Sequence, residues 1–240
     1  MDKILNFRPL AEGLYTKQNK KIKEGMVFRS GAPDRATEDD IKELHEHHIN
    51  HIYDLRRDIE RGKLNPNIYI DVISYEMSHE PSKPSSKPFV ETVLEQGADH
   101  HMQFIYESYL PFSKLVKSAM HDIIHEKEPF LIHCAAGKDR TGAVAAIMML
   151  VLGFSEEDII NEYVKIDPKV IEYAIGVMRG QGHSEENIQA LMPMHTVKRA
   201  YMEKFIEGVK TKYSSYNDYL TNEIGLTEES MASFRKHLLT

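Results

Sequence analysis

Hydrophobic and polar positions along the chain follow the two periods of regular secondary structure. A short apolar run at 129–132 has the character of a buried strand, and the run Ala143–Leu152 has the apolar character and the length of a buried helix. Two further segments, 51–56 and 68–73, predict strands. The alternation of strands with helices predicts an α/β fold.

Polar residues and prolines mark where the predicted helices begin and end. The segment Thr37–Asp40 is typical of a helix start, and the helix that follows is predicted to end at Asn50. A helical stretch from 102 to 126 is interrupted at Pro111. Residues 78–88 hold three prolines and four serines, which predicts a loop.

The region after Gly153 is predicted to be helical throughout, and it carries capping signals at Ser155, Ser184 and Thr227. An apolar stripe on these helices includes Ile159, Ile160, Val164, Ile188, Leu191 and Met192. The first interpretation of this stripe is packing against the sheet. The second is that the excursion over about 155–210 forms a helical cap beside the mouth of a site.

One segment, HCAAGKDRTG at 133–142, joins the predicted strand to the predicted buried helix. It places Cys134 and Arg140 at the two ends of a seven-residue loop, a spacing that suits one phosphate group. At a junction of strand and helix, successive backbone N–H groups can point inward as an anion-binding nest, and the helix dipole adds partial positive charge. The sequence therefore predicts an anion site at this loop.

The side chains of this loop fit nucleophilic chemistry on phosphorus. A helix N-terminus and a neighbouring cation lower a thiol pKa from about 8.5 to roughly 3.5–7.5, which predicts that Cys134 is a thiolate nucleophile. The planar guanidinium of Arg140 can bind two phosphate oxygens at once. Thr141 is expected to support the thiolate with its hydroxyl, and His133 to fix the loop by hydrogen bonding.

Each feature of the loop has a plainer interpretation when it is taken alone. A lone cysteine after an apolar strand is usually an inert core thiol. Sulfur transferases also hold a loop cysteine. The joint pattern of Gly137 three residues after Cys134, Arg140 six residues after it, and Thr-Gly opening a helix favours the phosphate-binding thiolate.

The chain resembles the cysteine-dependent phosphatases of the protein-tyrosine phosphatase superfamily, and within it an atypical bacterial, LipA-like branch that shares the loop pattern HCxxGKDRTG. The resemblance extends over nearly the whole chain through four further segments: Asn6-Phe7-Arg8, Phe28-Arg29-Ser30-Gly31 as an Arg-Ser turn, Tyr53-Asp54-Leu55-Arg56 followed by Glu60, and Tyr213–Leu226. One segment, 9–13, departs from the Asp-Leu-Gly-Gly of many relatives. The resemblance implies a single domain over 1–240, with a central, mostly parallel sheet flanked by helices and extra C-terminal helices.

The resemblance also implies an activity, the hydrolysis of phosphotyrosine through a cysteinyl-phosphate intermediate, with phosphoinositides or phosphoserine and phosphothreonine as further substrates. The phosphate would be bound by Arg140 and the loop residues Ala135, Ala136, Gly137 and Lys138. By resemblance to inositol-lipid phosphatases, Lys138 would bind a second anion; the alternative is an exposed, solvated lysine. Two other functions stay open at this point: a phosphate-binding module without turnover and a sulfur transferase.

Two aspartates are candidates for the general acid that protonates the leaving oxygen. The LipA-like resemblance favours Asp139, which lies within the phosphate loop itself. The alternative role of Asp139 is to brace the loop or to form an ion pair with Arg56. Asp54 is the second candidate, as an acid or as a supporting residue, because it lies at the end of a strand, at the usual ligand-binding edge of an α/β sheet.

Composition limits the remaining function classes. The chain has 240 residues, is 41% hydrophobic, and carries a formal charge of −7, which argues against nucleic-acid binding. Cys134 is the only cysteine, so no intramolecular disulfide can form. The sequence shows neither a signal peptide nor a membrane-spanning stretch. A cytoplasmic location is the default expectation, and the resemblance leaves export without a signal peptide open.

Four histidines lie close together in the sequence: His45, His47, His48 and His51. Those that share a helix face can bind a metal adventitiously, but no ordered set of carboxylates accompanies them. The expected chemistry needs neither a metal nor a cofactor. The sequence does not determine the oligomeric state.

Overall fold

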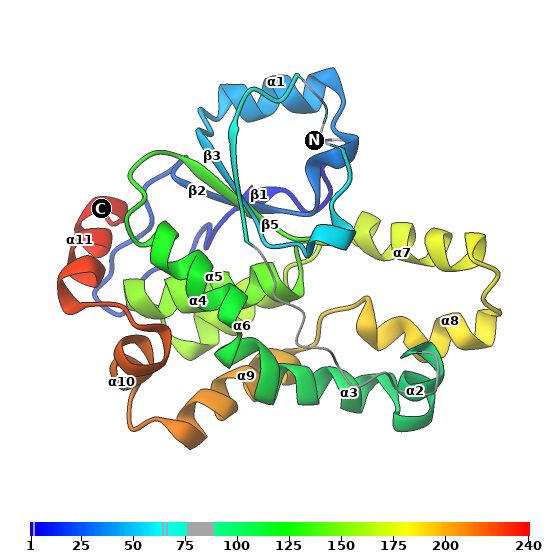
Figure 1. Ribbon diagram of the computed structural model, residues 1–240. Coiled ribbons are helices and arrows are strands. Elements are labelled where there is room, and N and C mark those ends of the chain that lie inside the picture. The colour runs from blue at the N-terminus through cyan, green and yellow to red at the C-terminus, as the bar shows by residue number, and fades with distance from the viewer. Residues whose placement is uncertain (2, 64, 66, 76–88) are drawn as a thin grey trace.

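A five-stranded mixed sheet forms the centre of the protein in the computed structural model, which describes residues 1, 3–63, 65, 67–75 and 89–240 (Figure 1). The order across the sheet is β1-β2-β5-β3-β4. β1 pairs antiparallel with β2, and the other three pairs of neighbours are parallel. The predicted α/β fold with a mostly parallel sheet is therefore confirmed. The strands are β1(Arg8–Pro9), β2(Val27–Ser30), β3(His51–Asp54), β4(Asp71–Ser74) and β5(Phe130–His133).

Helices connect and cover these strands. Those before β5 are η1(Pro33–Arg35), α1(Glu38–Glu46), η2(Asp58–Glu60), α2(Phe89–Gln96), α3(Ala98–Phe104), the π-helix η3(Ile105–Tyr109), η4(Leu110–Phe112) and α4(Lys114–Ile123). Those after β5 are α5(Asp139–Leu152), α6(Glu156–Val164), α7(Pro168–Gly180), α8(Glu185–Leu191), η5(Met192–Met194), α9(Arg199–Lys212), α10(Tyr216–Asp218), the π-helix η6(Tyr219–Ile224) and α11(Glu228–Leu238).

The central strand β5 is buried on both faces. Alternate side chains of a strand point to opposite sides of the sheet, and those of β5 enter a different core on each side. Phe130 and Ile132 belong to the large core formed with α4, α5 and the C-terminal helices, whereas Leu131 packs in a smaller core with Ile41 and Leu44 of α1. Figure 1 shows α1 on one face of the sheet and α4, α5 and α6 on the other. This two-sided burial explains the continuous apolar run that predicted the strand.

Several predicted boundaries move in the structure. β3 ends at Asp54 and β4 begins only at Asp71. The predicted turn at 28–31 is wrong, since most of it is strand β2. α1 ends at Glu46 rather than near Asn50, because the backbone turns through a positive φ of 55° at His48. The predicted loop at 78–88 lies outside the described residues.

The helical region after Gly153 divides between two cores. The capping positions Ser155, Ser184 and Thr227 each accept a hydrogen bond from a backbone N–H of the helix that follows, as predicted. Ile159 and Ile160 join the large core, but Ile188 and Leu191 pack with α2, α3 and α7 in a separate cluster, so the sheet is not their partner.

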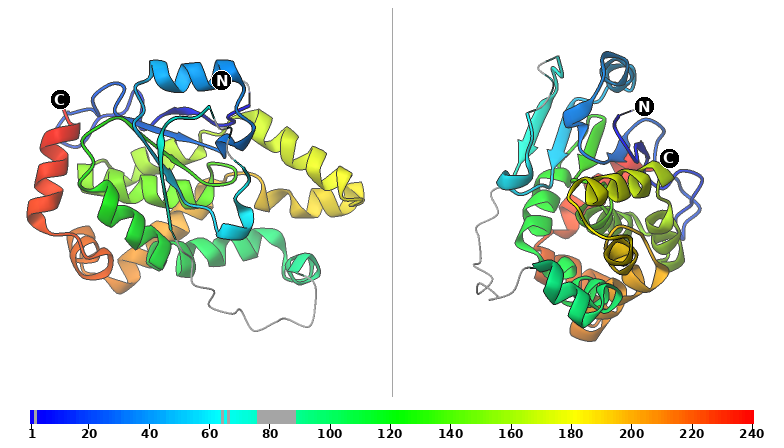
Figure 2. Two further views of the ribbon diagram at one scale, coloured as in Figure 1. Left: turned by 45° about the horizontal axis from the view of Figure 1, so that its top comes forward. Right: turned by 90° about the vertical axis from the view of Figure 1, so that its right-hand side faces the viewer.

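Helices α7 and α8 project from the body of the molecule and are joined at their far ends (Figures 1 and 2). Within the described part of the chain, every helix is too short or too polar to span a membrane.

Candidate active site

The phosphate loop, residues 134–140, leaves the end of the central strand β5 and leads into α5. Its tight path depends on Gly137, whose φ is +66° and whose Cβ, if present, would lie 2.3 Å from the carbonyl oxygen of Ser30. Only glycine fits both conditions. The predicted strand, loop and helix are therefore present, and the loop lies at the carboxyl edge of the parallel strands.

Cys134 lies at the base of this loop and is 3% exposed. Burial by itself raises the pKa of its thiol, but the charge of Arg140 and the neighbouring hydroxyl and backbone N–H of Thr141 lower it further than burial raises it. The net direction is a pKa below the ordinary value of a thiol, which favours the reactive thiolate.

His133 is fully buried directly before the cysteine. Its Nδ1 lies 3.2 Å from the carbonyl oxygen of Cys134, and its Nε2 lies 3.7 Å from Oδ1 of Asp54. Burial lowers the pKa of the imidazole, although Asp54 opposes that effect. A neutral ring that bonds the main chain next to the sulfur agrees with the supporting role expected for it.

Arg140 is held in place by a carboxylate from η2, the short helix after β3. Its two terminal nitrogens donate to the two carboxylate oxygens of Glu60 at 2.7 and 2.9 Å, and Nη1 also donates to the carbonyl oxygen of Leu55 at 3.0 Å. Burial raises the pKa of Glu60, but hydrogen bonds from Arg140 and Arg57 lower it to about 2. In the sequence, Glu60 stands out only as part of a motif, without an assigned role.

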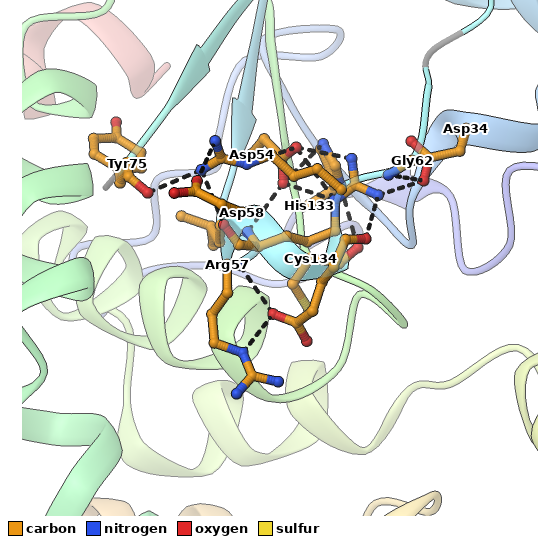
Figure 3. A network of polar contacts seen from close by, with 12 residues as sticks. Asp34, Asp54, Arg57, Asp58, Gly62, Tyr75, His133 and Cys134 are labelled. Carbon is orange, nitrogen blue, oxygen red and sulfur yellow. Dashed lines mark hydrogen bonds and ion pairs between the residues drawn. The ribbon is translucent and has the colours of Figure 1, made fainter. Parts of the chain in front are cut away.

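Arg56 forms a second network close to the cysteine, and it lines the cavity described below together with Asp34. Its Nη2 donates to Asp54 Oδ2 at 2.8 Å, and its Nη1 donates to Asp34 Oδ2 at 2.5 Å. Figure 3 shows Asp54 and His133 close to Cys134, with Asp34 on one side of the network and Tyr75 on the other. Arg56 thus pairs with Asp54 and Asp34, so the expected alternative of an ion pair between Asp139 and Arg56 is wrong.

Asp54 is 2% exposed and does not line the cavity described below. Burial raises the pKa of its carboxyl, but the hydrogen bonds from Arg56 and the positive charge of Arg56 outweigh burial and lower it. An ionised, enclosed carboxylate suits a structural partner of Arg56 and His133 better than an acid that must reach a leaving group.

Side chains from the N-terminal part of the protein bind main-chain carbonyl oxygens of the phosphate loop. Asn6 Nδ2 donates to the carbonyl oxygens of Gly137 at 3.0 Å and Ala136 at 3.3 Å, and Arg29 Nη2 donates to Gly137 at 2.8 Å. Arg29 is in turn paired with the buried Glu162 of α6 at 3.4 Å. The Asn-Phe-Arg and Arg-Ser segments are part of the family resemblance, but the sequence contains no signal that Asn6 and Arg29 contact the loop.

Lys138 and Asp139 face the helices instead of the sheet. The Lys138 ammonium is buried, and it donates to the carbonyl oxygens of Met194 at 2.7 Å and Thr196 at 3.0 Å. The interpretation of Lys138 as a solvated surface lysine is therefore wrong. Its Nζ also lies 3.2 Å from Asp139 Oδ1, which accepts a hydrogen bond from Tyr106 at 2.6 Å.

A cavity of about 740 Å³ opens above the loop. Cys134, Asp139 and Arg140 line it together, as do Ala135, Ala136 and Lys138. The opposite wall is largely apolar and comes from α7 and α8, through Val170, Tyr173, Ala174, Val177, Met178 and Leu191. Basic residues line it as well: Lys3, Arg35 and Lys169. The three side chains assigned chemical roles from the sequence thus share one cavity.

The four neighbouring histidines have different surroundings. His47 packs against the rings of Phe28 and Phe7, at centroid distances of 4.7 and 5.5 Å. His51 lies 2.7 Å from a carboxylate oxygen of Glu126, which follows α4. Among the described residues no group of three or more histidine, cysteine or acidic side chains is placed to hold a metal.

A buried cysteine and an arginine at the ends of one loop, at the carboxyl edge of an α/β sheet, define a cysteine-dependent phosphatase. The chain belongs to the tyrosine phosphatase family, whose family model matches residues 1–240. It is therefore an enzyme of the protein-tyrosine phosphatase type, with the fold of that class.

Two curated proteins are similar to this chain. One, from Cupriavidus necator and assigned by name to the tyrosine-protein phosphatases, is 24% identical over 99% of the chain and 87% of its own length. The other is the triple specificity protein phosphatase PtpB of Mycobacterium tuberculosis, 24% identical over 69% of the chain and 67% of its own length.

Solved phosphatase structures give weaker matches. TpbA of P. aeruginosa is 14% identical with a TM-score of 0.38, over 83% of this chain and 87% of its own. The catalytic domain of the S. cerevisiae phosphatase Siw14 is 17% identical with a TM-score of 0.41, over 83% of this chain and 91% of its own.

Proposed function

We propose that this phosphatase hydrolyses phosphotyrosine through a cysteinyl-phosphate intermediate on Cys134. The observation that supports it is the shared cavity of Cys134, Asp139 and Arg140, in which the environment favours the thiolate. The apolar wall from α7 and α8 suits the phenyl ring of the substrate. On this proposal the excursion over 155–210 caps the site.

The proposed reaction has two steps. The Cys134 thiolate attacks phosphorus while the bond from phosphorus to the tyrosyl oxygen breaks, and Asp139 gives its proton to that oxygen. Arg140 and the backbone N–H groups of the loop bind the non-bridging oxygens as charge develops on them. Water then attacks the phosphocysteine, Asp139 accepts a proton from it, and inorganic phosphate leaves with the thiolate restored.

Phosphoinositides are the second proposed substrate class. The basic residues Lys3, Arg35 and Lys169 share the cavity with the phosphate loop, and their positive charges would bind further phosphate groups. The printed name of the mycobacterial relative, a triple specificity phosphatase, agrees with broad specificity. Phosphoserine and phosphothreonine remain part of the proposal, and rates on the three kinds of substrate decide between them.

Two substitutions test the proposed mechanism. Cys134→Ser should abolish turnover and retain vanadate binding, because a serine hydroxyl is not ionised at neutral pH. Asp139→Asn should slow hydrolysis of phenyl phosphate by about 10²-fold or more, in line with ~10²–10⁴ for general acid catalysis, and slow hydrolysis of p-nitrophenyl phosphate clearly less, since p-nitrophenolate needs no proton to leave.

The outcomes that would contradict the mechanism differ for the two residues. Turnover above about one per cent in Cys134→Ser, on the scale of ~10²–10⁴ for a single catalytic group, would exclude the cysteinyl-phosphate. Uniform loss across leaving groups in Asp139→Asn would indicate a damaged loop, and no loss with phenyl phosphate would assign the acid to another carboxylate. Activity with thiosulfate would instead identify a sulfur transferase.

A further inference from the structure

Two buried tyrosines form a hydrogen-bonded chain that ends on Asp139. The hydroxyl of Tyr163 donates to the hydroxyl of Tyr106 at 2.8 Å, and Tyr106 donates to Asp139 Oδ1 at 2.6 Å. Tyr106 is fully buried and Tyr163 is 2% exposed. The three residues come from η3, α6 and α5, so the chain exists only in the folded protein.

The backbone that carries Tyr106 is unusual. Tyr106 belongs to the π-helix η3, a type of helix that is rare and often occurs at functional sites. The π-helix packs against α9 at Gly208, where an added Cβ would lie 2.2 Å from the carbonyl oxygen of Glu107. Tyr201 of α9 stacks on the Tyr106 ring at a centroid distance of 5.8 Å. These contacts fix the position of the Tyr106 hydroxyl.

The chain of hydrogen bonds has one favoured direction. Burial and the charge of Asp139 both raise the pKa of Tyr106 well above its ordinary value, so its hydroxyl keeps its proton. The Tyr163 hydroxyl has no other acceptor among the described residues, so the reverse direction would leave its buried proton unpaired. Tyr106 therefore donates to Asp139 and does not accept from it.

This direction distinguishes the two oxygens of the Asp139 carboxyl. Oδ1 accepts from Tyr106 and lies 3.2 Å from the Lys138 ammonium, so two donors occupy it. Oδ2 has no hydrogen-bond partner among the described residues, and the Asp139 side chain is 32% exposed and lines the cavity. A proton on the carboxyl is thus expected on Oδ2, the oxygen free to face a substrate.

We propose that Tyr106, supported by Tyr163, is a positioning residue that holds Oδ1 of Asp139 and thereby presents Oδ2 as the proton donor. The inference rests on the proposed role of Asp139 as general acid. It differs from that role in that Tyr106 contacts neither phosphorus nor the leaving group; it acts only through the orientation and ionisation of the carboxyl.

The test compares Tyr106→Phe with the matched control Tyr201→Phe. Both variants remove one buried phenol hydroxyl from the same stack, but the Tyr201 hydroxyl donates to Asp99 Oδ1 and not to the chain. Tyr106→Phe should reduce kcat for phenyl phosphate about 10-fold, a part of the ~10²–10⁴ of general acid catalysis, and reduce it much less for p-nitrophenyl phosphate. Tyr201→Phe should leave this ratio unchanged.

Two further readouts separate positioning from a structural role. A donated hydrogen bond favours an ionised carboxylate, so the basic limb of the kcat profile should move to higher pH in Tyr106→Phe. In the Asp139→Asn background, Tyr106→Phe should have no further effect on the ratio between the two substrates, because coupled residues are not additive. Tyr163→Phe should shift both readouts in the same direction, by less.

The outcomes distinguish the positioning role of Tyr106 from the proposed role of Asp139 as general acid, on which it rests. If Asp139→Asn shows a loss that depends on the leaving group and Tyr106→Phe does not, the positioning role is wrong and the general acid stands. If Asp139→Asn shows no such dependence, the role of Asp139 fails first. Should Tyr106→Phe not fold, judged by circular dichroism and vanadate binding, Tyr163→Phe decides: an unchanged ratio and pH limb would overturn the inference.

Discussion

The two halves of the phosphate loop are held in different ways. Residues 134–137 are held through their main chain, since Asn6, Arg29 and the backbone N–H of Ala32 all donate to carbonyl oxygens of this half. Residues 138–140 are held through their side chains, each of which has partners from another part of the chain. With its carbonyls bound outward, the first half can turn N–H groups toward an anion. In the second half, each of the three charged side chains is positioned separately by its own partners.

The difference implies that a substitution that disturbs the first half lowers turnover of every substrate alike. A substitution that disturbs the second half changes only the chemical role of the side chain concerned. Gly137→Ala is the strongest test of the first statement. An added Cβ would lie 2.3 Å from the Ser30 carbonyl oxygen at a φ of +66°, so the loop must shift. We expect a loss of about 10²-fold or more, the cost of a misplacement of about 1 Å, that is equal for phenyl and p-nitrophenyl phosphate.

The control for Gly137→Ala is Gly208→Ala, in which the added Cβ would lie 2.2 Å from the Glu107 carbonyl oxygen. That clash displaces the segment that carries Tyr106 and leaves the first half of the loop in place. Its loss should therefore depend on the leaving group, and vanadate binding should survive in Gly208→Ala but not in Gly137→Ala. Retained vanadate binding in Gly137→Ala would show that the first half tolerates a different path.

Glu60→Gln tests the second half at Arg140. Charge-assisted hydrogen bonds contribute about 1.5–3 kcal/mol, so loss of the carboxylate should lower kcat/KM about 10-fold or more on all aryl phosphates. Because Arg140 binds phosphate in both steps, the effect should not depend on the leaving group. Equal kcat/KM in variant and parent would show that Arg140 is positioned without Glu60.

The same variant makes a prediction about stability and pH. The pKa of Glu60 is lowered to about 2 in the folded protein, below the ordinary ~4.3 of an unfolded chain. The ion pair therefore stabilises the fold fully above about pH 4.3, and this stabilisation is lost as the pH falls toward 2. Urea unfolding should show the largest difference between parent and Glu60→Gln at neutral pH and a shrinking difference below about pH 4.

The smallest expected effect is the change in substrate preference that Lys138→Ala causes. The ammonium is bound by two carbonyl oxygens and lies next to Asp139, so its contacts are internal. Removing one such group should reduce turnover about 10-fold, by the same factor on a phosphoinositide and on phenyl phosphate, since both leaving oxygens need a proton. A selectively larger loss on the phosphoinositide would show that Lys138 turns toward a second phosphate, as the resemblance to inositol-lipid phosphatases implies.

The phosphate loop was predictable because its function depends on residues that are close in the sequence. A buried strand, seven residues and a buried helix dictate where Cys134 and Arg140 can lie, and the structure places both in one cavity with Asp139. The helix caps at Ser155, Ser184 and Thr227 were predictable for the same reason, since a capping bond spans only two or three residues. Apolar period alone did not distinguish a helix that packs on the sheet from one that packs on other helices, as Ile188 and Leu191 show.

The sequence by itself determined the family, the α/β fold and the residues that line the phosphate loop. These follow from local patterns, because the order and spacing of residue types within a short segment indicate its secondary structure and its chemistry. The tertiary structure decided which groups orient those residues: Glu60 on Arg140, Asn6 and Arg29 on Gly137, and Tyr106 on Asp139. These partners lie between 33 and 131 residues away in the chain. A single tyrosine or glutamate at such a separation carries no local signal, and only the packing of helices onto the sheet brings its polar atom to the site.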